Sequence, residues 1–152
     1  MSGVAEERAA AFAAAWDEVV AGLSGRYSLS LRSMAGREGE REASAPHYAA
    51  STIKLPVLAG WYADRAEGRS EAFGAVLVHD RFAGATGDSF TLSQADDQDD
   101  QTWSCLGGEA DVGWLAERMV VASGNLATDL LVERLGIDSA RRCLNRAGLA
   151  DQ

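Results

Sequence analysis

The fold of this chain is decided by the stretch Ala49-Ala50-Ser51-Thr52-Ile53-Lys54-Leu55-Pro56-Val57-Leu58. It contains Lys54, the only lysine in the sequence, three residues after Ser51, whereas all the other Lys-or-Arg positions hold arginine. Arginine cannot act as a base, because its pKa lies above about 12. A single lysine beside a serine therefore suits a nucleophilic site in which the amine takes the proton of the hydroxyl.

The same stretch predicts a helix that begins at Ser51 or just before it and ends near Glu67, with Pro56 close enough to the start to be tolerated. In such a helix Ser51 and Lys54 lie on one face about one turn apart, so the amine reaches the hydroxyl. Partial burial and the helix dipole both lower the lysine pKa, and Ser51 N–H becomes an oxyanion donor. The alternative is a serine N-cap followed by a solvated lysine; the apolar neighbours of Lys54 favour the nucleophilic site.

A second polar motif, Ser123-Gly124-Asn125, interrupts a helical pattern. Apolar spacing predicts one helix from Asp111 to Ala122 and another from Leu126 to Leu135, closed by Gly136. A third helix follows, capped by Asp138 or Ser139. A hydroxyl and a carboxamide on a tight loop suit a proton shuttle and an amide-binding donor, although the same tripeptide also occurs as an ordinary turn between helices.

Together the two motifs resemble the serine β-lactamase and penicillin-binding-protein superfamily, most closely the class A β-lactamase-related serine hydrolases. The resemblance covers roughly residues 26–152. Three blocks carry it: residues 49–58 with the Ser-x-x-Lys motif, LAERMVVASGNLAT at 115–128, and LLVERLG at 130–136. It implies an α+β, β-lactamase/transpeptidase-like fold, with a helical subdomain and the first strands of an antiparallel sheet.

The resemblance also implies a role for each matching residue. Ser51 corresponds to the acylated nucleophile, Lys54 to its base or proton relay, and Ser123 to the serine that passes a proton to the leaving nitrogen. Asn125 corresponds to the asparagine that hydrogen-bonds the amide of the substrate. The family has an aspartate between these last two residues, where this chain has Gly124, and that difference puts the rigidity of the loop in question.

Other family elements are expected beyond Gln152, namely the Lys-Thr-Gly strand and the glutamate that activates the deacylating water. Two strands alone would leave a long unpaired edge. We therefore expect residues 1–152 to be the N-terminal portion of a single β-lactamase-like domain. A second polypeptide, from a split gene or a cleaved chain, is expected to supply the C-terminal strands.

The rest of the sequence predicts an amphipathic helix at residues 4–23 and a strand at 27–31 that pairs with residues 40–45. Residues 96–100, Asp-Asp-Gln-Asp-Asp, are expected to form a solvated acidic loop without a metal. Trp103 is a candidate for lining a substrate cleft near Ser51, with ordinary core packing as the alternative.

Composition excludes several classes of partner. The formal net charge of −9 disfavours binding to nucleic acid or to an anionic membrane. The N-terminus has no positively charged segment ahead of an apolar one, so we expect no secretory signal and a cytoplasmic protein. Cys105 and Cys143 have no metal-ligand spacing and are expected to be reduced. We expect no cofactor and no metal.

The sequence thus predicts a serine hydrolase that acts on a small-molecule amide, lactam or ester through an acyl-enzyme at Ser51. Two alternatives stay open. One is a catalytically impaired binding module that retains the fold. The other is an acyltransferase of natural-product biosynthesis, which hands the acyl group to an amine instead of water.

Overall fold

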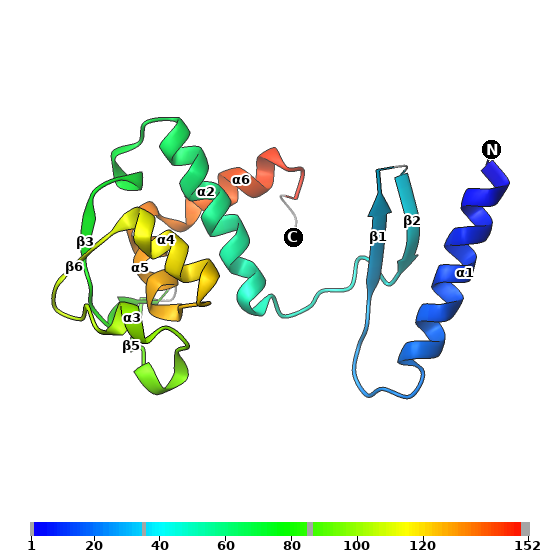
Figure 1. The fold of residues 1–152 in the computed structure, drawn as a ribbon, viewed down its shortest axis with the longest axis horizontal. Coiled ribbons are helices and arrows are strands. Elements are labelled where there is room, and N and C mark those ends of the chain that lie inside the picture. Colours follow the sequence, from blue (N-terminus) through cyan, green and yellow to red (C-terminus); the bar gives the residue numbers. More distant parts are fainter. Residues whose placement is uncertain (1, 35, 85–86, 150–152) are drawn as a thin grey trace. The chain divides into compact units, whose positions relative to one another are not determined.

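The chain divides into two units, residues 1–48 and residues 49–152. The computed structural model describes residues 2–34, 36–84 and 87–149. Each unit has its own helices and strands (Figure 1). Within the described residues, no helix is both long enough and apolar enough to cross a membrane.

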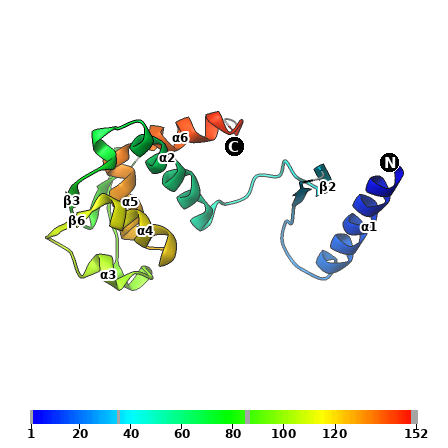
Figure 2. The same cartoon turned by 45° about the horizontal axis from the view of Figure 1, so that its top comes forward.

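In the first unit, a long helix packs against a two-stranded antiparallel sheet (Figure 2). The helix is α1 (Ser2–Val20), and the strands are β1 (Leu29–Ser33) and β2 (Gly36–Arg41). Arg41 of β2 ties the sheet to α1 through an ion pair with Asp17, at 3.0 Å. The predicted helix and antiparallel pair are both present, but their bounds differ. The helix ends at Val20, the first strand spans Leu29–Ser33 instead of 27–31, and the second spans Gly36–Arg41 instead of 40–45.

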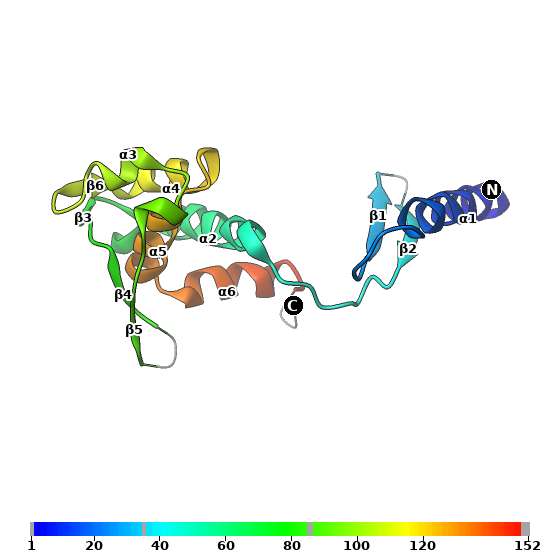
Figure 3. The ribbon, with the colours of Figure 1, turned by 90° about the horizontal axis from the view of Figure 1, so that it is seen from below.

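The second unit is mainly helical, with two small antiparallel strand pairs. Its helices are α2 (Lys54–Ala66), α3 (Asp100–Trp103), α4 (Val112–Val121), α5 (Asn125–Leu135) and α6 (Ile137–Arg146), with 3-10 turns η1 (Ala50–Ile53), η2 (Ser70–Ala72) and η3 (Gln94–Asp96). Strand β3 (Ala75–Leu77) pairs with β6 (Glu109–Asp111), and β4 (Arg81–Ala83) pairs with β5 (Ser89–Thr91). Helix α2 lies along α6, α4 packs against α5, and the β4–β5 hairpin projects from the helices (Figure 3).

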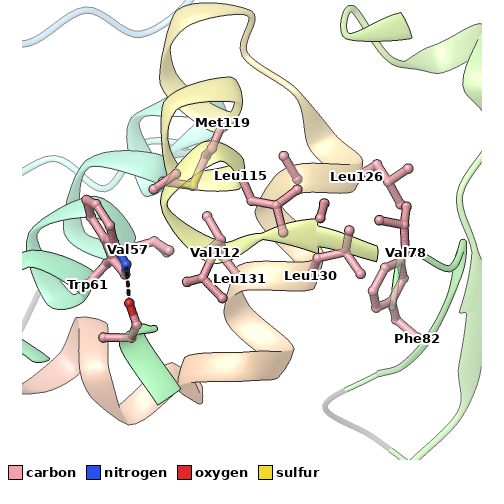
Figure 4. Close-up of a cluster of buried hydrophobic side chains, with 14 of the residues drawn as sticks. Val57, Trp61, Val78, Phe82, Val112, Leu115, Met119, Leu126, Leu130 and Leu131 are labelled. Atoms are coloured by element: carbon pink, nitrogen blue, oxygen red, sulfur yellow. Dashed lines mark hydrogen bonds between the residues drawn. The ribbon is translucent and has the colours of Figure 1, made fainter. Parts of the chain in front are cut away.

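The hydrophobic core of the second unit lies between α2, α4 and α5 (Figure 4). Its fully buried members include Leu115 and Met119 of α4 and Leu126 and Leu131 of α5. Trp61 of α2 closes one side, and its indole N–H donates to the carbonyl of Ala72 at 3.1 Å. Because α4 and α5 both contribute to this core, the turn between them is held firmly against α2.

Helix α2 is also fixed by a close approach to α6. A Cβ at Gly60 would lie only 2.7 Å from Ser139 Oγ, so a glycine is required for the two helices to come this near. One turn further along, the buried carboxylate of Asp64 accepts hydrogen bonds from Ser139 Oγ at 2.5 Å and from Arg142 at 2.9 Å. These contacts set the axis of the helix that begins at Lys54.

Two predicted helix starts are wrong. The α-helix begins at Lys54, not at Ser51, because Ala50 has a φ of 45° and the chain then makes a 3-10 turn before the regular helix. Helix α6 begins at Ile137 with Gly136 as its N-cap, so neither Asp138 nor Ser139 caps it. Gly136, with a φ of 74°, ends α5 and starts α6 in a single residue, which leaves no room for a side-chain cap.

Replacing Leu115 with alanine should lower the free energy of unfolding of the second unit by about 2–5 kcal/mol, because the residue is fully buried and the cavity is not refilled. The matched control is Val121→Ala in the same helix, where the side chain is 73% exposed. This change should stay within about 0.5 kcal/mol of the wild type. Urea unfolding measures both, and equal effects of the two substitutions would contradict this description of the core.

Candidate active site

Two serine hydroxyls meet where the turn between α4 and α5 lies beside the start of α2. Ser51 Oγ is 3.1 Å from Ser123 Oγ, although 72 residues separate them in the sequence. The backbone is unusual at both places, since φ is 55° at Ser123 itself and 45° at Ala50, the residue before Ser51. Non-glycine residues rarely adopt positive φ, at a cost of about 1–3 kcal/mol, and such residues cluster at functional sites.

Lys54 is buried against the same turn, with 6% of the residue exposed. Its Nζ lies 2.6 Å from the carbonyl oxygen of Ser123, 3.0 Å from Ser123 Oγ and 3.0 Å from Asn125 Oδ1. A buried lysine is rare unless its donors have partners, and here all three donors of an ammonium group are used. The structure thus brings together four predicted site residues, Ser51, Lys54, Ser123 and Asn125.

The predicted direct contact between Ser51 and Lys54 is replaced by a bridge. Among the hydrogen bonds of the described residues, none joins Ser51 Oγ to Lys54 Nζ; both atoms instead contact Ser123 Oγ. The reason is the 3-10 turn, which changes the direction of Ser51 relative to a helical start. Proton exchange between the serine and the lysine therefore has a path through the hydroxyl of Ser123.

The partners of Lys54 decide where its lone pair points when it is neutral. The carbonyl oxygen of Ser123 and the Oδ1 of Asn125 can only accept hydrogen bonds, so both must receive an N–H. The Nδ2 of Asn125 is engaged with the carbonyl of Asp96 at 3.3 Å, which fixes the orientation of its amide group. The lone pair of a neutral amine is then left facing Ser123 Oγ, a hydroxyl that is able to donate.

Electrostatic effects on Lys54 act in opposite directions. Burial disfavours the ammonium form and lowers the pKa of Lys54, while the nearby carboxylates of Asp97 and Asp129 raise it; burial dominates. Burial also raises the pKa of Asp129 above its usual range, with a further contribution from the like charge of Asp97 and an opposing one from Lys54. The site thus holds an amine that loses its proton more readily than a surface lysine.

The prediction of a solvated acidic loop is wrong for two of its carboxylates, Asp97 and Asp99, while Asp96, Gln98 and Asp100 are exposed. Asp97 accepts hydrogen bonds from the backbone N–H groups of Asn125, at 2.9 Å, and Leu126, at 2.8 Å. It therefore caps the start of α5. Burial alone would raise the pKa of Asp97, but these donors and the indole of Trp103 lower it below its usual value. No local pattern in the sequence indicates this contact, whose partners are 28 residues apart.

The remaining predicted residues have different surroundings. Trp103 is buried, with 7% exposed, and donates from its indole to Asp97 at 2.9 Å, so its substrate-binding role stays a prediction. Gly124, the turn residue between Ser123 and Asn125, is buried. Within the described residues, no group of three or more His, Cys, Asp or Glu side chains is arranged to hold a metal ion.

Two serines and a buried lysine thus meet on an α+β fold, and comparison with known proteins identifies the family. The model of a family described as the beta-lactamase enzyme family matches residues 11–152. The chain belongs to this family, and thus to the serine β-lactamase and penicillin-binding-protein superfamily. The predicted resemblance and fold class are confirmed. No curated protein and no solved structure matches the chain.

The single lysine makes its titration directly measurable, because a chain labelled with [13C]-lysine and free of tags gives one lysine side-chain signal. We expect Lys54 to titrate below the ordinary value of about 10.4, since burial disfavours its charged form. Asp129→Asn should lower the pKa of Lys54 further, because it removes a carboxylate that favours the ammonium. Asp138→Asn, at an exposed position of α6, is the charge-matched control. An unshifted or raised lysine pKa would contradict this description.

Proposed function

We propose that the protein is a serine hydrolase that forms an acyl-enzyme at Ser51 with a small-molecule amide, lactam or ester. Membership of the beta-lactamase enzyme family supports a hydrolase of the serine type in general. The observation that carries the proposal is the position of Ser123 Oγ, 3.1 Å from Ser51 Oγ and 3.0 Å from Lys54 Nζ. A nucleophile, a relay and a base then lie in one hydrogen-bonded line.

In the proposed acylation step, Ser51 Oγ forms a bond to the carbonyl carbon of the substrate. Its proton passes to Ser123 Oγ while the proton of Ser123 passes to the neutral Lys54, which becomes an ammonium group. The tetrahedral intermediate then collapses as the carbonyl–heteroatom bond breaks. Ser123 gives its proton to the leaving nitrogen or oxygen and regains one from Lys54, so the acyl-enzyme forms with the relay back in its starting state.

Water completes the proposed reaction by hydrolysing the ester at Ser51 and releasing a carboxylic acid. We propose the backbone N–H of Ser51 as one oxyanion donor. We also propose that Asn125, an exposed residue next to the relay, binds an amide of the substrate. We propose Gly124 and Trp103 as further substrate-binding residues. We also propose a cytoplasmic location.

The acyltransferase alternative shares every step up to the acyl-enzyme and differs only in the acceptor, an amine instead of water. The impaired binding module differs earlier, because it forms no acyl-enzyme. Reaction with a fluorescent penicillin or a fluorophosphonate therefore separates the binding module from the two enzymes. Turnover of nitrocefin without an added amine separates the hydrolase from the acyltransferase.

Ser51→Ala should abolish covalent labelling by such a probe, and Ser123→Ala should slow labelling by about 100-fold or more, because proton transfer contributes about 10²–10⁴-fold. The matched control is Ser104→Ala, at an exposed serine after α3. It should label like the wild type. Gel fluorescence measures the rates, and peptide mass spectrometry locates the adduct. Labelling that survives in Ser51→Ala would refute the proposal.

We further propose that a second polypeptide completes the sheet of the first unit. Its support is that β1 pairs with β2 alone among the described residues, which leaves one edge of β1 open. Native mass spectrometry of the protein purified from its native source should show a second, different chain bound to it. A stable monomer of 16.1 kDa that is labelled at Ser51 would overturn this part of the proposal.

A further inference from the structure

Gly124 is a glycine for reasons of space and not of backbone conformation. Its φ of −62° and ψ of 123° are accessible to any amino acid. A Cβ at this position would, however, lie 3.0 Å from both the Cβ and the Oδ2 of Asp99. The neighbouring Ser123 has the positive φ and yet is not a glycine. The packing of Asp99 against position 124 therefore explains why the turn has a glycine there.

The side chain behind the turn, Asp99, is held rigidly. It is 1% exposed, and its carboxylate accepts hydrogen bonds from the guanidinium of Arg118 and from Thr102 Oγ1, the latter at 2.5 Å. Arg118 lies in the last turn of α4, and its carbonyl accepts from the N–H of Gly124 at 3.3 Å. Asp99 thus contacts the turn directly at Gly124 and also binds Arg118, whose carbonyl holds the N–H of Gly124.

We propose that Asp99 is a positioning residue for the relay serine, and that Asp99 and Gly124 form one complementary pair. The carboxylate fills the space next to residue 124 and binds Arg118, whose carbonyl holds the N–H of Gly124. Both contacts keep the turn in the strained conformation of Ser123 that places its hydroxyl between Ser51 and Lys54. A chain conformation with positive φ persists only where the surroundings determine it. The effect on reaction rate rests on the proposed acyl-enzyme; the effect on the geometry of the turn does not.

Asp99→Asn tests this role, because it keeps the side-chain volume and removes the charge that binds Arg118. Labelling at Ser51 should slow by about 10-fold to 100-fold, since a displacement of about 1 Å in a reacting group costs up to about 100-fold. The [13C]-lysine signal of Lys54 should shift as well, because its Nζ contacts two atoms of Ser123. Asp100→Asn, at the next residue, which is exposed at the start of α3, is the charge-matched control and should change neither measurement.

A carboxylate moved across the pair gives a test that does not depend on loss alone. In the double variant Asp99→Gly with Gly124→Asp, the new carboxylate lies near the space that Asp99 vacates, within reach of Arg118. The double variant should label at least about tenfold faster than Asp99→Gly, whereas Gly124→Asp alone should be slower than the wild type because of the 3.0 Å contact. A double variant no faster than Asp99→Gly would overturn the pairing.

The outcomes separate this inference from the proposed function. If the wild type and Asp100→Asn are not labelled but the Lys54 signal still responds to Asp99→Asn, the acyl-enzyme is wrong and the positioning role stands. If the wild type is labelled and Asp99→Asn has the same rate and the same lysine signal, the positioning role is wrong and the acyl-enzyme stands.

Discussion

The structure of the site depends on one buried amine that is bound entirely by a single turn of the chain. All three acceptors of Lys54 Nζ come from Ser123 and Asn125, and two of them can only accept. The Ser123 hydroxyl is consequently the one contact through which a proton can move in either direction, and it also touches Ser51. Ser123 is therefore the centre of the geometry, although Ser51 and Lys54 form the more conspicuous motif in the sequence.

Burial and charge act together on this amine. Burial of Lys54 on folding lowers its pKa and so favours the neutral amine. The carboxylates of Asp97 and Asp129 act in the opposite direction and partly stabilise the ammonium form. Because the folded-state pKa lies below the unfolded value, the unfolded chain binds more protons between those two values. This group therefore favours folding more as the pH rises through that window. At lower pH, where Lys54 is charged in both states, the free energy required to bury the ammonium group is offset by the hydrophobic core between α2, α4 and α5.

The sequence predicted much of this site because its chemistry lies in short, local patterns. The Ser-x-x-Lys spacing and the single lysine pointed to Ser51 and Lys54, and both residues lie in the site. The break in the helical pattern at Ser123 is the turn between α4 and α5. The bridging role of the Ser123 hydroxyl was not predictable, because it follows from a 3-10 turn after Ala50 that no local pattern indicates.

The largest error was the loop at residues 96–100, and its cause is physical. A run of carboxylates is normally solvated, and only long-range contacts can bury one. Asp97 accepts hydrogen bonds from backbone N–H groups of α5, and Asp99 forms an ion pair with Arg118. The partners of both carboxylates are distant in the sequence. Gly124 suggested a less rigid loop for the same reason. The residue that packs against it, Asp99, is distant in the sequence, so no local pattern indicated the contact.

The most direct test of this account compares two titrations of the same molecule. The rate at which an acylating probe modifies Ser51 is measured from neutral to alkaline pH, and the protonation of Lys54 is followed by its single [13C]-lysine signal. If the amine receives the proton of Ser51 through Ser123, the rate must rise with the same apparent pKa as the lysine signal. A rate that is unchanged while Lys54 loses its proton would contradict the central claim.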